Sequence, residues 1–313
     1  MVKVLVTGGS GLVGQTLREI LPDAVYPSST NYDLRKEEDV IRMYCEHKPD
    51  AVVHLAGRVA GIYDHLRYPV QYFEENLLMN TFVLRHAKTH GVTKFIGMLS
   101  TCIYPDTLDH YPLTESDLHK GPPTATVFSY AYSKRALAVQ IDAYNKQYGT
   151  NYNYLVPCNL YGKFDKFNES HSHFLSDLMR KIRNAEEEIV LFGTGRPIRQ
   201  FMDAGDLVKV IVHYLENQID ESVNVATPEV YTIKEMAEIA IRACGKPYLR
   251  IVFDESKVDG QYRKDVSIDR LKAVMPSFSC KSLYEGIQET YQYLVNPNSK
   301  VRGLNVEYKG PRD

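Results

Sequence analysis

The chain has 313 residues, 44% hydrophobic and 24% charged, a composition typical of a folded globular protein with one large domain or two modest ones. Its net charge of −2, with no basic stripe, makes a nucleic-acid partner unexpected. Five widely spaced cysteines without a C-x-x-C pair indicate neither a disulfide framework nor a metal site, and no apolar run approaches the roughly 18 residues of a membrane span. We therefore expect a cytoplasmic protein without a membrane partner.

Short apolar runs alternate with amphipathic segments through the first half of the chain. We predict strands within residues 2–9, 24–26, 50–57, 94–100 and 153–162, and helices at 12–21, 37–47, 77–90 and 130–148. Strands buried on both faces lose the polar alternation of an open sheet, as these do. The pattern predicts an α/β fold built on a doubly wound parallel (Rossmann) sheet.

The pattern changes beyond about residue 163. A helix is predicted at about 174–183, and apolar segments at about 203–227 return to the first sheet. We therefore predict a Rossmann domain of residues 1–163 with that return segment. Residues 164–202 and 228–313 are predicted to form a smaller C-terminal α/β substrate domain.

A glycine-rich turn follows the first predicted strand. Gly8, Gly11 and Gly14 form a G-x-x-G-x-x-G pattern that opens a helix. Such glycines permit a tight turn and let a pyrophosphate approach the helix N-terminus, where free N–H groups favour anions. The turn predicts a dinucleotide site, and a purely structural turn is the alternative.

The second predicted strand indicates which dinucleotide is bound. A carboxylate at its end would hold a ribose 2′-hydroxyl and repel a 2′-phosphate. Here the strand runs into Pro27, Ser28, Ser29, Thr30 and Asn31, with Arg35 nearby and Asp33 placed to contact the adenine side. We expect NADP(H); the alternative is that this stretch is only a polar loop.

Tyr130 and Lys134 form Y-x-x-x-K on a predicted helix and lie one turn apart on one face. An ammonium beside a phenol lowers its pKa, which makes tyrosine a usable acid, and the lysine also reaches the nicotinamide ribose. Ser100, about 30 residues earlier, ends a predicted strand where it would hydrogen-bond a substrate carbonyl. Taken alone, the spacing also occurs by chance among 23 tyrosines.

Together these residues resemble the extended short-chain dehydrogenase/reductase family. The run Ser100-Thr101-Cys102-Ile103-Tyr104-Pro105, without the Asp-Glu pair of the family's dehydratases, resembles the GDP-L-fucose synthases in particular. Further matching stretches are HLAGRVAGI (54–62), GPP (121–123), PCNLYGKFDKF (157–167), SHFLSDLMRK (172–181), FGTGRPIRQF (192–201) and FDESKVDGQYRK (253–264). The resemblance covers nearly the whole chain.

The resemblance implies an enzyme that epimerises a GDP-4-keto-6-deoxy-hexose at C3 and C5 and then reduces C4 with NADPH. Cys102 and His173 are implied as the acid/base pair, since a 4-keto group acidifies both neighbouring C–H bonds. Chemistry alone would accept His171 equally, and only the match to SHFL selects His173. Ser100, Tyr130 and Lys134 complete the implied catalytic set.

The resemblance also implies the binding residues and the assembly. The implied cofactor-binding residues are Gly8, Gly11, Leu12, Val13, Gly14, Asp33, Arg35, Lys134, Pro157, Asn159, Leu160 and His173. The implied residues for the GDP-sugar are Lys181, Phe192, Arg199 and Asp259, with lysine at 181 where some members have arginine. Helices 77–90 and 130–148 are implied to pair across a two-fold axis, so we expect a homodimer.

Two other functions remain open from the sequence. One is a C4 reductase without epimerase activity, acting on a GDP-4-keto-6-deoxy-hexose or on a heptose. The other is a non-catalytic dinucleotide-binding sensor. Retention of Ser100, Tyr130 and Lys134 together disfavours a sensor, which needs no proton donor.

Overall fold

A parallel sheet of five strands forms the centre of the computed structural model, which describes residues 2–59, 61–168, 172–257 and 259–303. Its strands lie in the order β1 (Val4–Thr7), β2 (Ala51–His54), β3 (Lys94–Met98), β4 (Tyr152–Pro157) and β9 (Val223–Val225). Every described pairing between them is parallel. The predicted α/β fold with a Rossmann-type sheet is confirmed, and the carboxyl ends of these strands meet at one edge.

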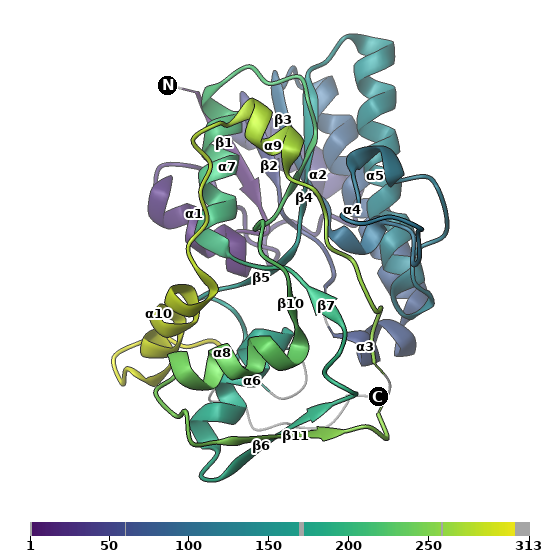
Figure 1. Ribbon diagram of the computed structural model, residues 1–313. Coiled ribbons are helices and arrows are strands. Elements are labelled where there is room, and N and C mark those ends of the chain that lie inside the picture. The colour runs from purple at the N-terminus through teal and green to yellow at the C-terminus, as the bar shows by residue number, and fades with distance from the viewer. Residues whose placement is uncertain (1, 60, 169–171, 258, 304–313) are drawn as a thin grey trace.

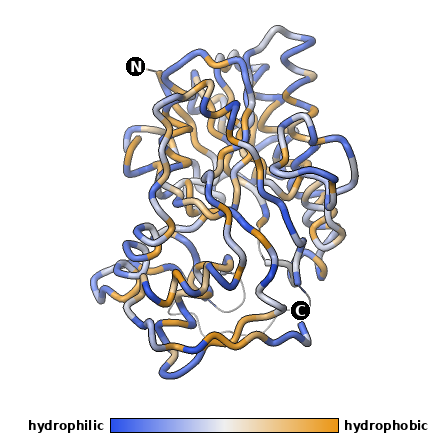
Figure 2. Tube along the Cα trace, in the orientation of Figure 1, coloured by the Kyte–Doolittle hydropathy of each residue, from blue (hydrophilic) through white to orange (hydrophobic). Residues whose placement is uncertain are grey.

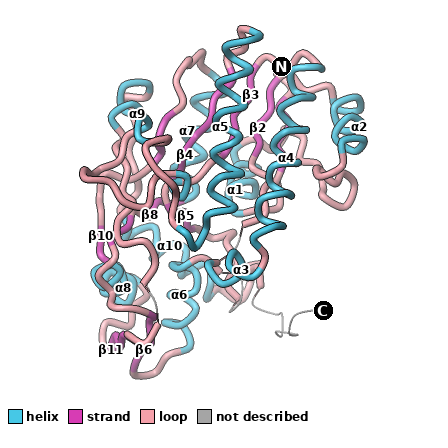
Figure 3. The backbone as a smooth tube through the Cα atoms, turned by 90° about the vertical axis from the view of Figure 1, so that its right-hand side faces the viewer, coloured by secondary structure: helices cyan, strands magenta, loops and turns pink. Residues whose placement is uncertain are grey.

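Helices cover both faces of this sheet (Figure 1). On one side lie α1 (Leu12–Ile20) and α7 (Ala204–Glu216), and on the other lie α4 (Pro69–Thr89) and α5 (Phe128–Tyr148). The helices α2 (Glu37–His47) and α3 (Ile62–Arg67) both contact α4, which runs beside α5 in Figure 3. The short 3₁₀ turns are η1 (Thr101–Ile103), η2 (Glu115–Asp117) and η3 (Ala125–Val127).

The rest of the chain forms a second lobe below the sheet edge (Figure 1). Its strand pairs are β5 (Asn159–Tyr161) with β8 (Phe201–Asp203), β6 (Glu188–Phe192) with β11 (Arg250–Asp254), and β7 (Ile198–Arg199) with β10 (Tyr231–Thr232). Its helices are α6 (Phe174–Asn184), α8 (Ile233–Ala243) and α10 (Leu283–Val295), whereas α9 (Asp269–Val274) lies on the Rossmann lobe, against β9. Figure 2 shows the tube of β6 and β11 as hydrophobic along most of its length, although only Ile189 and Leu191 of β6 are buried.

Two hydrophobic cores correspond to the two lobes. One surrounds the five-stranded sheet, and the other joins α6, α8 and α10 to β6. Val266, Ile268 and Leu271 belong to the first core, although the sequence pattern assigns 228–313 to the substrate domain. The reason is pairing: Leu113 N donates to Asp265 O at 2.9 Å, which draws this segment and α9 back onto the Rossmann lobe.

Two predicted strands differ from the structure. Residues 24–26 form only an isolated bridge, in which Val25 pairs with Leu5, because Pro27 follows at once. The predicted strand at 153–162 is two strands, β4 and β5, which separate at Cys158 and join different sheets. Within the described ranges, no helix combines the length and the apolarity needed to cross a bilayer.

Candidate active site

The glycine turn lies where β1 meets α1. Gly8 has φ +75°, and a Cβ there would stand 2.7 Å from Ala56 N. A Cβ on Gly14 would stand 2.5 Å from Gly8 O, so both positions require glycine. Gly11 is the N-cap of α1, and Leu12 and Val13 begin the helix. The turn therefore offers a bare helix N-terminus suited to an anion.

Gly14→Ala is expected to lower the free energy of unfolding by about 1–3 kcal/mol, because the added methyl group has no space beside Gly8 O. Urea denaturation measures the change. Gly61→Ala is the matched control, since a Cβ there meets nothing within 4 Å. Equal stability of the two variants would contradict the close packing of this turn.

Asp33 and Arg35 lie beyond the Val25 bridge and bind each other. Arg35 Nε and Nη2 donate to the two carboxylate oxygens of Asp33, each at 2.8 Å, and Arg35 also lies 3.5 Å from Glu75. The arginine lowers the pKa of Asp33 to about 2. The Arg35 side chain is 48% exposed despite this pairing, so its guanidinium remains accessible to a phosphate.

Pro157 is the last residue of β4, and Asn159 and Leu160 follow in β5. Asn159 Nδ2 donates to Gln200 O at 2.8 Å, which ties this stretch to the second lobe. Leu12 lies against Gly162, since a Cβ there would stand 3.4 Å from its Cδ1. A hollow of about 540 Å³ beside the turn is lined by Gly9, Ser10, Gln15, Arg18, Glu19, Phe164 and Arg302.

Tyr130 and Lys134 are both buried on the inner face of α5. Lys134 Nζ donates to Met98 O at 2.9 Å and lies 3.2 Å from the position of a Cβ on Gly57. Burial lowers the pKa of Lys134 to about 8. Burial raises the pKa of Tyr130, and a hydrogen bond with Ser100 partly offsets this rise. The lowering of this phenol's pKa by the ammonium of Lys134 stays a prediction.

Cys102 lies in the 3₁₀ turn directly after β3. Ser100 caps that turn, and its Oγ accepts from Cys102 N at 3.3 Å. Arg135 on α5 fixes the same turn, since its Nε donates to Ile103 O at 3.0 Å. Burial raises the pKa of the Cys102 thiol, but Lys264 and Ser100 outweigh it and the net pKa is lowered. A thiol with a lowered pKa is a usable base.

His173 is the N-cap residue of α6 and pairs with a buried carboxylate. Its Nδ1 lies 3.1 Å from both oxygens of Asp165, which also accepts from Ser176 Oγ. Partial loss of hydration lowers the pKa of His173, but the hydrogen bond and the charge of Asp165 outweigh this, so the net pKa is raised. The imidazole, 45% exposed, leaves Nε2 as its outer nitrogen. The rival candidate His171 lies outside the described residues.

The predicted substrate residues form two contacts in the second lobe. Lys181 Nζ lies 5.2 Å from the centre of the Phe192 ring, which is 52% exposed. Asp259 accepts from Thr194 N and Oγ1, at 2.9 and 2.7 Å. Arg199 is electrostatically coupled to both Asp259 and Cys102, which links this group to the thiol.

Three residues at the site carry roles that the sequence reasoning missed: Asp165, Arg135 and Lys264. Asp165 lies in the stretch PCNLYGKFDKF, and an acid eight residues before a histidine was the available signal. Lys264 is the last residue of the stretch FDESKVDGQYRK, in which the family resemblance implied a role for Asp259 alone. Arg135, one residue after Lys134, gave no signal because its role depends on contact with Ile103.

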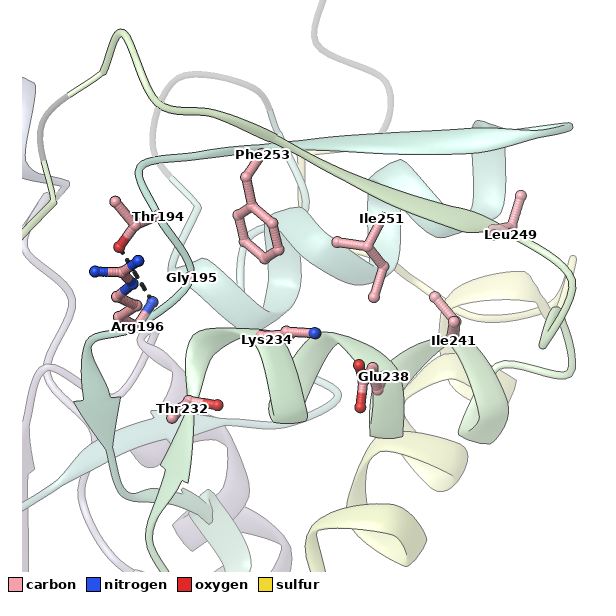
Figure 4. Close-up of a pocket in the computed structure, with 10 residues that line it drawn as sticks. All are labelled: Thr194, Gly195, Arg196, Thr232, Lys234, Glu238, Ile241, Leu249, Ile251 and Phe253. Carbon is pink, nitrogen blue, oxygen red and sulfur yellow. Dashed lines mark hydrogen bonds between the residues drawn. The ribbon is translucent and has the colours of Figure 1, made fainter.

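A separate hollow of about 670 Å³ lies between the β6–β11 ribbon and α8 (Figure 4). It is lined by Thr194, Gly195, Arg196, Thr232, Lys234, Glu238, Ile241, Leu249, Ile251 and Phe253. Cys102, Tyr130 and His173 are not among these residues. This hollow is therefore distinct from the cluster at the sheet edge.

Known proteins share both the sequence and the fold. Residues 4–226 match the model of the NAD dependent epimerase/dehydratase family. A GDP-L-fucose synthase from Dictyostelium discoideum is 34% identical over 96% of this chain and 97% of its own length. A GDP-L-fucose synthetase structure from Naegleria fowleri bound to NADP is 32% identical, covering 92% of this chain and 91% of its own, with a TM-score of 0.83.

A GDP-mannoheptose C4 reductase from Campylobacter jejuni, with NADP bound, is 25% identical with a TM-score of 0.83, covering 93% of this chain and 97% of its own. Both the matched family model and the relative at 34% identity extend over most of the chain. The chain therefore belongs to the NAD dependent epimerase/dehydratase family, in the branch that contains the GDP-L-fucose synthases.

Proposed function

We propose that the protein is an NADPH-dependent epimerase/reductase that converts a GDP-4-keto-6-deoxy-hexose to a GDP-6-deoxy sugar such as GDP-L-fucose. The observation that carries this proposal is the cluster at the carboxyl end of β3. Ser100 Oγ accepts from Cys102 N at 3.3 Å there, and Cys102 contributes to the raised pKa of both the buried Tyr130 and His173. The curated relatives named GDP-L-fucose synthase support it.

The cofactor is NADP(H), and the residues present fit it. The glycine turn leaves the N-terminus of α1 open to a pyrophosphate, and Lys134 lies beside the bare backbone of Gly57, within reach of a ribose. Arg35 is half exposed and suited to a 2′-phosphate. When bound, the reduced nicotinamide supplies the hydride for C4. The NADP bound to the Naegleria fowleri structure supports the assignment.

Epimerisation needs a base and an acid on opposite faces of the sugar ring. The Cys102 thiolate takes a proton from the carbon beside the ketone, and the electron pair moves into an enolate whose oxygen Ser100 and Tyr130 hold. The His173 imidazolium then returns a proton to the other face. The lowered pKa of Cys102 and the raised pKa of His173 favour this division of roles near neutral pH.

Reduction at C4 uses Tyr130 as the proton donor. Its raised pKa keeps the phenol protonated until an alkoxide forms at O4, and the alkoxide then takes the proton. We also propose that Lys181, Phe192, Arg199 and Asp259 bind the GDP-sugar from the second lobe. Cations at 181 and 199 suit the diphosphate, and Phe192 offers a ring for the base.

The domain division follows from the same arrangement. We propose that residues 1–163 and 203–227 bind the cofactor, and that 164–202 and 228–313 bind the substrate. The segment around 266–271 is the exception, because it packs in the first core. The two separate cores support this division.

The test is whether the protein consumes NADPH when GDP-4-keto-6-deoxymannose is added. The loss of NADPH absorbance measures this consumption. We expect turnover with NADPH and a lower kcat/KM with NADH, because Arg35 has no 2′-phosphate to bind there. Absence of turnover with either cofactor would overturn the proposal and favour the sensor. Turnover without proton exchange at C3 and C5 would favour the C4 reductase.

We further propose a cytoplasmic homodimer. All five cysteines are free thiols, which supports a reducing compartment. The outer sides of α4 and α5 expose large apolar residues, among them Leu78 at 40% and Val139 at 50%. These helices lie side by side, so two copies would bury both in a four-helix contact (Figure 3).

Val139→Glu is expected to convert the dimer to a monomer, because a carboxylate in an apolar interface loses its hydration without a partner. Size-exclusion chromatography with light scattering measures the mass. Ile20→Glu is the control, since Ile20 is 58% exposed on α1, away from these helices. A dimer that survives Val139→Glu would contradict this interface.

A further inference from the structure

Lys264 brings an ammonium group to the Cys102 thiol. Its Nζ lies 3.6 Å from Cys102 Sγ, although the two residues are 162 positions apart in the chain. The lysine is partly buried, and it reaches the thiol from the segment that links the two lobes. A cation held this close to sulfur favours the thiolate over the thiol.

The backbone on both sides of Lys264 is fixed by hydrogen bonds. Ile198 N donates to Tyr262 O at 2.8 Å, two residues before the lysine. Val266 N donates to Gln200 Oε1 at 2.9 Å, two residues after it. Because Gln200 is itself buried, residues 262–266 have little freedom to move the Lys264 ammonium away from the Cys102 thiol.

Four charged or titratable groups act on Cys102. They are Lys264, Arg199, His173 and Tyr130. Among those that lower the pKa of the thiol, Lys264 acts most strongly, and Arg199 acts more weakly. Arg199 also faces Asp259, and its Nη1 donates to Ile198 O at 2.7 Å, whereas Lys264 is directed at the sulfur.

We propose that Lys264 is a positioning residue that holds Cys102 as a thiolate in the free enzyme and so makes it the base of the epimerisation. This inference rests on the proposed function, which supplies the C–H bond that the base attacks. Lys264 itself exchanges no proton with the sugar. The thiolate takes the proton and becomes a thiol, the electron pair enters the enolate, and His173 returns a proton on the opposite face.

The proposal fixes the direction of proton flow. After one inversion, Cys102 is a neutral thiol and His173 a neutral imidazole, so both must exchange protons with water before the next. The Cys102 thiol loses its proton to water, which the ammonium of Lys264 favours, and the His173 imidazole takes a proton from water, which the carboxylate of Asp165 favours.

The test is the pH dependence of Cys102 alkylation by iodoacetamide, followed by mass spectrometry of the peptide that contains Cys102. In Lys264→Met the midpoint is expected to rise by about one pH unit, and the rate at a pH well below both midpoints to fall about tenfold. Lys264→Arg keeps the charge and is expected to restore most of the rate. Lys272→Met, which removes an exposed lysine of α9, is expected to match the unmodified protein.

An unchanged alkylation profile in Lys264→Met would overturn the proposal. So would a profile in Lys264→Arg as displaced as that of Lys264→Met. If Lys264→Met fails to fold by circular dichroism, Lys264→Gln takes its place with the same expected shift. Alkylation needs neither sugar nor NADPH. A lack of turnover in the unmodified protein would therefore contradict the proposed function without changing the alkylation profile of Cys102.

Discussion

Tyr130→Phe is expected to lower kcat for reduction of the 4-keto sugar by about 10²–10⁴-fold, because no other group then protonates the alkoxide at O4. Proton exchange at C3 and C5 should persist at a reduced rate, since Cys102 and His173 remain while Ser100 alone then holds the enolate oxygen. The variant should fold, because the ring keeps its contacts with His65 and Tyr72, at centroid distances of 5.2 and 6.4 Å. Stopped-flow oxidation of NADPH and NMR-detected exchange measure the two steps separately.

Tyr132→Phe is the matched control for that experiment. Tyr132 lies on the same helix two residues later, and the centre of its ring lies 4.6 Å from that of Phe128 in a tilted contact. Removing its hydroxyl should leave both steps unchanged. If Tyr130→Phe impaired exchange and reduction equally, Tyr130 would be needed mainly to hold the enolate or the fold, and its assignment as a dedicated proton donor would be wrong.

Cys102→Ser is expected to have the opposite effect to Tyr130→Phe: it should impair proton exchange and leave reduction intact. A serine hydroxyl remains protonated where a thiol beside Lys264 ionises, so hydrogen–deuterium exchange at C3 and C5 should fall by about 10²–10⁴-fold. Reduction of a ketone already inverted at both carbons should continue, because Ser100 and Tyr130 are intact. NMR of the sugar protons in heavy water measures the exchange.

Cys45→Ser is the control for Cys102→Ser. Cys45 is exposed on α2, and its sulfur lies 3.6 Å from His90 Nε2. The same chemical change at this position should alter neither step. A normal exchange rate in Cys102→Ser would remove the thiol from the mechanism and leave the protein a reductase with a different base or none.

The sequence predicted the parallel sheet and its first glycine turn because these depend on local patterns. Gly8 and Gly14 stand at fixed spacing after an apolar run, and their backbone needs are local. The isolated bridge at Val25 was harder to predict, since a short apolar run ending at Pro27 does not reveal how many pairs it makes. The number of pairs depends on how residues 24–26 meet β1, and a local sequence pattern does not record that.

Sequence motifs and the family resemblance led to the proposed catalytic residues, but neither indicated their electrostatic partners. Lys264 reaches Cys102 only because a segment 162 residues later crosses between the lobes. The sequence also suggested that Lys134 lowers the pKa of Tyr130. That effect stays a prediction; what the sequence did not indicate is that Lys134 Nζ donates to Met98 O and that burial raises the pKa of Tyr130. Such effects depend on solvent exclusion, which no residue spacing records.

The most direct measurement of the central claim is product analysis by NMR after turnover of GDP-4-keto-6-deoxymannose with NADPH in heavy water. If Cys102 and His173 act on opposite faces of one ketosugar, the product should carry deuterium at both C3 and C5 and the inverted configuration at both carbons. A reduced product with hydrogen retained at C3 and C5 would contradict the account.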